Sequence, residues 1–97
     1  MRILSRKRLR EFATRHPGAK AQLDAWWAEA SKAKWKSFHD LNQRYRTADQ
    51  VAGNLVIFNI CGNKYRLIVK IDYNASMGFI KFVGTHAEYD KIDVKNL

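Results

Sequence analysis

The second half of the chain contains three apolar runs with the length and composition typical of β-strands. The runs cover residues 54–60, 65–73 and 79–83, and they are separated by Gly, Asn and Ser residues that favour turns. Because connections this short join only antiparallel neighbours, the pattern predicts a three-stranded meander.

The middle run has two faces of different character, since successive residues of a strand point to opposite sides of a sheet. Its apolar face consists of Tyr65, Leu67, Val69, Ile71 and Tyr73, and its mixed face consists of Arg66, Ile68, Lys70 and Asp72. We expect the apolar face to pack on helices and the mixed face to meet a ligand. The two cations lie about 13 to 14 Å apart at the usual rise per residue. Lys81, in the third run, joins them if the register places it on the same face.

The first half of the chain has helical periodicity. Residues 1–4 are a candidate short strand, and Ser5 is a candidate cap for a basic helix that ends near Arg15. Pro17 suits a first helical position, so a second helix should begin there. The apolar stripe of that helix consists of Ala19, Leu23, Trp26, Trp27 and Ala30. We expect an antiparallel helix pair whose tryptophans lie in the core rather than stack on nucleotide bases.

Two further capping patterns complete the prediction. Ser37 followed by Asp40 indicates a short third helix, and Thr85 followed by Glu88 indicates a helical turn directly after the last strand. That turn would project His86, Tyr89 and Asp90 beside the strand end. The elements together predict one small α+β domain, residues 1–97, with a short strand and a helix pair packed on an antiparallel sheet.

Net charge narrows the class of partner. The 97 residues contain 18 Lys and Arg against 9 Asp and Glu, which gives a net charge of +9, and residues 1–50 hold 12 of those 18 cations. Such an excess favours a polyanion, because cationic side chains displace the counterions of nucleic acid. A membrane surface or an acidic protein would also satisfy it, and the basic helix before residue 15 is equally well interpreted as a solvated surface.

Several classes of protein are not indicated. No apolar run approaches the roughly 18 to 20 residues of a membrane-spanning helix, and the opening residues are too short for the apolar centre of a signal peptide. The single Cys61 forms no internal disulfide, and no Cys or His spacing suggests a metal site. We therefore expect a cytoplasmic protein with no cofactor.

Two segments resemble the HigB-type toxins of bacterial toxin–antitoxin pairs, within the RelE/ParE-like superfamily. They are F-N-I-C-G-N-K-Y-R-L-I, residues 58–68, and V-G-T-H-A-E-Y-D-K-I-D, residues 83–93. The resemblance is close over about residues 55–93 and holds only in pattern before them. It implies a small RelE-like toxin that cleaves mRNA on translating ribosomes, without a metal, and arrests growth. It also implies a cognate HigA-like helix-turn-helix antitoxin as partner.

The resemblance also implies roles for particular side chains. Arg66 would neutralise charge on the phosphate in the transition state, because a guanidinium binds phosphate oxygens bidentately. His86 and Tyr89 would act as acid and base, in an order that the sequence leaves open. The expected RNA contacts are Lys70 and Lys81, followed by Lys64 and Asn59.

Two other functions remain compatible with the residues alone. A ParE-like member would inhibit DNA gyrase without cutting RNA, and a plain RNA-binding module would use the same cations for binding. In a purely structural interpretation Arg66 would pair with Glu88 or Asp90, Lys70 would be an ordinary edge cation, and Tyr89 would lie in the core.

Overall fold

The computed structural model describes residues 1–97 and contains a mixed five-stranded sheet with the order β1-β5-β4-β3-β2. The strands are β1 (Arg2–Leu4), β2 (Asp49–Val51), β3 (Leu55–Ile60), β4 (Tyr65–Asp72) and β5 (Met77–Thr85). The expected antiparallel meander of β3, β4 and β5 is confirmed. β1 adds parallel to β5 at one edge. β2, which the sequence pattern did not indicate, adds to β3 at the other edge.

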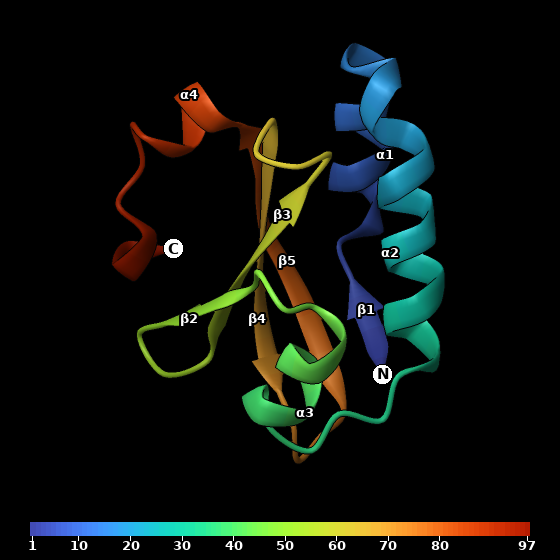
Figure 1. Ribbon diagram of the computed structural model, residues 1–97, viewed down its shortest axis with the longest axis vertical. Helices are drawn as coiled ribbons and strands as arrows, with labels where there is room; N and C mark the ends of the chain where they lie inside the picture. Colours follow the sequence, from blue (N-terminus) through green and yellow to red (C-terminus); the bar gives the residue numbers. More distant parts are fainter.

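The helices are α1 (Arg6–Arg15), α2 (Lys20–Lys32), α3 (Phe38–Arg44) and α4 (His86–Tyr89). α1 and α2 cover one side of the sheet, whereas α4 and the chain end lie on the other (Figure 1). A 3-10 turn over Pro17–Ala19 joins α1 to α2, so the second helix begins slightly later than expected. None of these helices combines the length and the apolar character that a membrane-spanning segment requires.

The two predicted serine caps have different outcomes. The Ser37 hydroxyl accepts a hydrogen bond from the Asp40 N–H at 3.2 Å, so the cap of α3 is confirmed. Ser5 precedes α1 but its side chain caps nothing, and that part of the prediction is wrong. The reason is its left-handed backbone, with φ of 69°, whereas a capping residue needs extended dihedrals.

The main core lies between the sheet and the helix pair. Trp26 is buried and meets the Phe58 ring edge-on, with the ring centroids 5.2 Å apart. Trp27 is half-buried, and the Arg6 guanidinium covers its ring at 3.7 Å from the centroid. The tryptophans therefore belong to the core and its margin, as expected, and are not a platform for bases.

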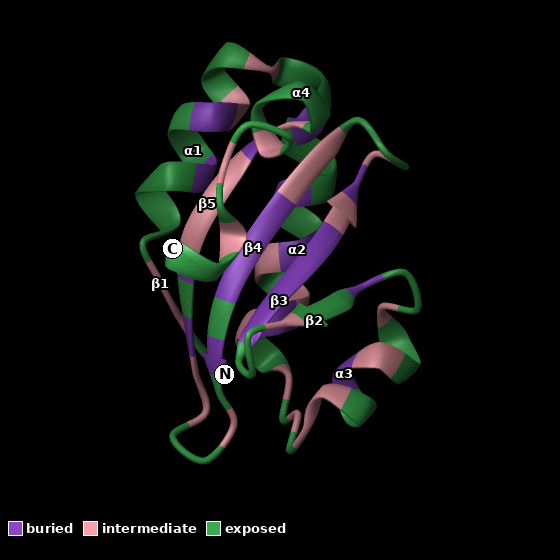
Figure 2. Cartoon of the chain, turned by 90° about the vertical axis from the view of Figure 1, so that its left-hand side faces the viewer, coloured by how far each residue is buried: buried purple, intermediate pink, exposed green.

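We call the sheet surface opposite α1 and α2 the outer face. Its middle is apolar, with Leu55, Ile57 and Ile68 buried in a second cluster. The chain end covers this cluster with Ile92 and Val94 (Figure 1), and the long buried stretches of β3 and β4 are apparent in Figure 2. The mixed face, which we expected to meet a ligand, is therefore covered in its middle, because β3 is apolar on both sides and needs a cover on both.

A bulge in β5 changes the expected position of Lys81. Phe82 pairs with Ile68 and Ile80 pairs with Val69, so Lys81 has no partner on β4. Ile80 lies in the main core, whereas Phe82 packs on the outer face. Ile80 and Phe82 therefore lie on opposite sides of the sheet although they are two residues apart, because an extra residue in one strand shifts the alternation of its side chains.

Candidate active site

α4 is fixed to the end of β5 by a reciprocal capping box. The Glu88 N–H donates to the Thr85 hydroxyl at 3.1 Å, and the Thr85 N–H donates to the Glu88 carboxylate at 2.8 Å. The latter hydrogen bond holds the pKa of Glu88 below its usual value, because it stabilises the ionised carboxylate. The His86 N–H donates to the Lys64 carbonyl at 3.0 Å, which ties the turn between β3 and β4 to the start of α4.

The three residues expected to be catalytic come together at this end of the sheet. The Arg66 guanidinium carbon lies 5.6 Å from the centroid of the Tyr89 ring, within the range of a cation–π contact. The Tyr89 and His86 ring centroids are 6.5 Å apart. We call these residues the Arg66–Tyr89–His86 cluster.

Arg66 has no acidic partner. Its guanidinium donates to the Asn63 carbonyl at 3.2 Å and forms no salt bridge. Glu88 is occupied by the capping box, so the structural alternative in which it or Asp90 pairs with Arg66 is not observed. The residue opposite Arg66 on β5 is Gly84, which adds no side chain beside the guanidinium. The charge of Arg66 is thus available to an anionic ligand.

Asp90 contacts His86, a contact that the sequence interpretation did not include. Its carboxylate lies 3.1 Å from His86 Nδ1, and both side chains are about half-exposed. A carboxylate at this nitrogen favours the tautomer with the proton on Nδ1, which leaves Nε2 free to accept one. The spacing of four residues in one helical turn was the available signal.

Phe82 and Gly84 support Tyr89 in a way that spacing alone does not reveal. The Phe82 ring occupies the space beside Gly84, where an added Cβ would lie 2.5 Å from the Phe82 ring carbon Cζ. The same ring packs near Tyr89, with centroids 6.5 Å apart. Gly84 therefore leaves room for Phe82, which lies against the tyrosine of the cluster.

Of the expected RNA contacts, Lys64 and Asn59 lie near the cluster. Lys64 is exposed in the turn whose carbonyl binds the His86 N–H. Asn59 is the neighbour of Arg66 on β3, but its amide donates to the Thr47 carbonyl at 3.0 Å and holds the loop before β2. Lys64 is thus the freer of the two for a ligand.

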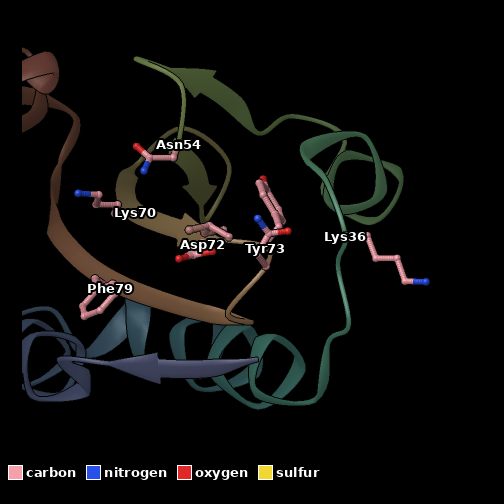
Figure 3. A pocket seen from close by; sticks show the side chains of 8 residues that line it. Lys36, Asn54, Lys70, Asp72, Tyr73 and Phe79 are labelled. Carbon is pink, nitrogen blue, oxygen red and sulfur yellow. The ribbon is translucent and has the colours of Figure 1, made fainter.

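Lys70 lies away from the Arg66–Tyr89–His86 cluster. It is four residues along β4 from Arg66, and the buried Ile68 separates them under the chain end. Lys70 is paired with Phe79 on β5 and lines a separate cavity of about 560 Å³ at the far end of the strand, together with Asn54 (Figure 3). Neither Lys70 nor Lys81 is brought into the cluster, and no group of three or more His, Cys, Asp or Glu side chains is arranged to hold a metal ion.

The middle strand of the meander carries an unpaired arginine, and the helical turn after the last strand places a tyrosine and a histidine beside it. This is the small α+β fold with a cationic site that the resemblance to the RelE-like class implies. The family model described as HigB_toxin, RelE-like toxic component of a toxin-antitoxin system, matches residues 19–92. The chain belongs to this family. As the toxic component of such a system, it is the counterpart of an antitoxin.

Individual relatives match over nearly the whole chain. The mRNA interferase toxin HigB of Escherichia coli (strain K12) is 26% identical over 92 residues, which cover 93% of this chain and 88% of the relative. The mRNA interferases HigB of Escherichia coli O157:H7 and Shigella flexneri match with the same identity and coverage. The resemblance drawn from the two C-terminal segments is therefore confirmed.

Proposed function

We propose that this toxin is an endoribonuclease that cleaves mRNA on translating ribosomes in the cytoplasm and so arrests growth. The observation that carries this proposal is the unpaired Arg66 guanidinium beside Tyr89, with His86 on the other side of the contact to Tyr89 and within hydrogen-bond distance of Asp90. The names of the relatives favour RNA cleavage over the alternatives of gyrase inhibition and simple RNA binding.

RNA cleavage without a bound cofactor requires three events at one phosphate. The 2′-hydroxyl loses its proton, its oxygen attacks the adjacent phosphorus, and the 5′-oxygen leaves with a proton. The products are a 2′,3′-cyclic phosphate and a 5′-hydroxyl. Charge that develops on the non-bridging oxygens needs a fixed cation, and Arg66 is the group in the cluster that stays protonated.

We assign the base to His86 and the acid to Tyr89. With Nδ1–H donated to Asp90, the free Nε2 of His86 accepts the 2′ proton. The Tyr89 hydroxyl gives its proton to the 5′-oxygen, and the Arg66 guanidinium close to the ring stabilises the phenolate that remains. Proton exchange with water restores both side chains. Asp90 is a positioning residue here, and Lys64 is the nearest expected phosphate contact.

Primer extension on mRNA in a translating extract tests this assignment. We expect Arg66→Ala and His86→Ala each to reduce cleavage at least tenfold, since one catalytic group contributes about 10²- to 10⁴-fold. Arg46→Ala and His39→Ala are matched controls, because both residues are exposed and lie on or just after α3. Wild-type rates in the two cluster variants, with folding intact, would remove those residues from the site.

Substituting Tyr89 with phenylalanine separates chemistry from packing. Tyr89→Phe keeps the ring against Phe82 and removes only the hydroxyl, so we expect cleavage to fall while the melting temperature changes little. Asp90→Asn should lower cleavage, because His86 loses the carboxylate that favours the proton on Nδ1. If the wild type produces no new 5′ ends in mRNA while supercoiling by gyrase falls, the result supports the ParE-like alternative instead.

We further propose a HigA-like helix-turn-helix protein as the antitoxin. Membership of the family establishes only that the toxin is paired with an antitoxin. The reading frame beside the gene tests the finer statement, because a small helix-turn-helix protein should be encoded there and should restore growth when it is co-expressed with the toxin.

A further inference from the structure

The arginines of α1 lie on two different sides of the helix. Arg8 and Arg15 line a groove of about 140 Å³ against Phe82 and Val83 of β5, together with Glu11. We call this the α1–β5 groove. Arg6 and Arg10 instead line a hollow shared with α2 on another side of the helix. The basic helix is therefore not a uniform cationic surface.

The two arginines of the α1–β5 groove carry free charge. Neither Arg8 nor Arg15 takes part in a salt bridge. The acidic residue between them, Glu11, has its charge offset by Lys7 at 3.6 Å. Arg15 makes one aromatic contact, with its guanidinium carbon 5.8 Å from the Phe12 ring centroid. The groove therefore presents two guanidinium groups that form no salt bridge.

The groove is continuous with the candidate active site through Phe82. This residue lines the groove and also packs near Tyr89 of the Arg66–Tyr89–His86 cluster. The groove also approaches α4 at a second place, since Arg15 is close enough to Glu88 for its positive charge to help lower the pKa of that carboxylate. The end of α1 and α4 lie at the same end of the molecule (Figures 1 and 2). The groove and the cluster are therefore neighbours that share Phe82.

We infer that the α1–β5 groove binds the phosphate backbone of the RNA strand as it leaves the Arg66–Tyr89–His86 cluster. Arg8 and Arg15 are seven residues apart, which is about 10.5 Å along a helix. That distance corresponds to about three stacked nucleotides at 3.4 Å each. Guanidinium groups at this spacing contact phosphates without reading bases, so the groove contributes affinity and direction rather than sequence preference. The inference rests on the proposed function, since that function makes RNA the ligand.

The test compares two double variants of one helix that remove equal charge. Arg8→Gln/Arg15→Gln empties the groove of cations, and Arg6→Gln/Arg10→Gln is the matched control on the other side. Glutamine keeps much of the aliphatic stem, and thermal melting verifies that each variant folds. The double variants also lose the aromatic contacts of Arg6 with Trp27 and of Arg15 with Phe12, so the single variants Arg8→Gln and Arg10→Gln give a second comparison in which no such contact is lost. The probe is a single-stranded RNA oligonucleotide with 2′-O-methyl groups, which cannot be cleaved, and fluorescence anisotropy measures its binding at several salt concentrations.

We expect the groove variant to bind the probe at least tenfold more weakly than the control variant. Its salt dependence should also fall by about 1.4 in the slope of log K against log salt, as for two lost contacts to a single strand. Equal affinities and slopes for both double variants would overturn the inference, because RNA binding would then depend only on the net positive charge of the protein and not on where the arginines lie. A groove variant that binds RNA normally but loses its antitoxin would overturn it too, in favour of a protein partner.

The two proposals fail in distinguishable ways. If the wild type binds the probe through the groove but never cleaves mRNA, the proposed function fails and the groove stands. If the wild type cleaves mRNA while the two double variants bind and cleave alike, the groove fails and the proposed function stands.

Discussion

The contact between Gly84 and Phe82 makes a strong prediction about the candidate site. In the variant Gly84→Ala the added Cβ would lie 2.5 Å from Cζ and 3.0 Å from Cε2 of the Phe82 ring. Carbon atoms do not approach this closely, so the ring must move. Because the Tyr89 ring and the outer-face cluster pack against the half-buried Phe82, the ring cannot move toward them without displacing them.

The expected cost follows from overpacking. Inserting a methyl group into a well-packed site costs about 1 to 3 kcal/mol, and 1 kcal/mol lowers the melting temperature of a domain of this size by about 4 to 8 °C. We therefore expect Gly84→Ala to melt well below the wild type. A displacement of Tyr89 by about 1 Å would in addition reduce cleavage by up to about 10²-fold. Calorimetry and primer extension measure the two effects.

Gly18→Ala is the matched control for the same chemical change. No atom lies within 4 Å of the Cβ that would be added at Gly18, so this variant should be as stable as the wild type or more stable by about 0.4 to 1 kcal/mol. Combining Gly84→Ala with Phe82→Leu removes the clashing ring and should cost less than the sum of the single variants. Strict additivity, or a Gly84→Ala protein as stable as Gly18→Ala, would refute the reasoning.

Three further predictions concern caps and the chain end. Ser37→Ala should lower the unfolding free energy by about 1 kcal/mol, whereas Ser5→Ala should leave it nearly unchanged because its hydroxyl caps nothing; urea titration compares them, and equal losses would contradict the cap assignment. The pKa of Glu88 is lowered, so its ionised carboxylate stabilises the fold at pH values above the ordinary pKa of 4.5, and this stabilisation is lost as the pH falls through the pKa of the folded state. The difference in unfolding free energy between wild type and Glu88→Gln, measured in urea, should therefore vanish at low pH. A difference that stays constant with pH would contradict this prediction. Ile92→Ala should cost about 1 to 2 kcal/mol, below the roughly 2 to 5 of a fully buried isoleucine, and an unchanged melting curve would mean that the chain end does not cover the outer face.

The meander, the helix pair and the capping box were predictable because each depends on residues close in sequence. Alternation within 65–73 assigned Arg66 to the face opposite the helices, and the spacing of Thr85 and Glu88 located α4. The cover of the outer face was not predictable, since nothing local shows that Ile92 packs on the cluster that contains Ile68 and Leu55, which lie 24 and 37 residues earlier in the sequence. The bulge at Lys81 was missed for a related reason, because a ladder irregularity depends on the partner strand.

The candidate site also depends on these non-local contacts. α4 spans only four residues, and a single helical turn is not stable alone because its nucleation cost exceeds the gain of its few hydrogen bonds. Its capping box satisfies the first N–H groups, while Phe82 beneath Tyr89 and the apolar residues after the turn anchor its other end. The positions of His86 and Tyr89 are therefore set by the packing of the outer face. This explains how exposed polar side chains can be held beside Arg66, and why apolar residues continue beyond the last residue of the candidate site.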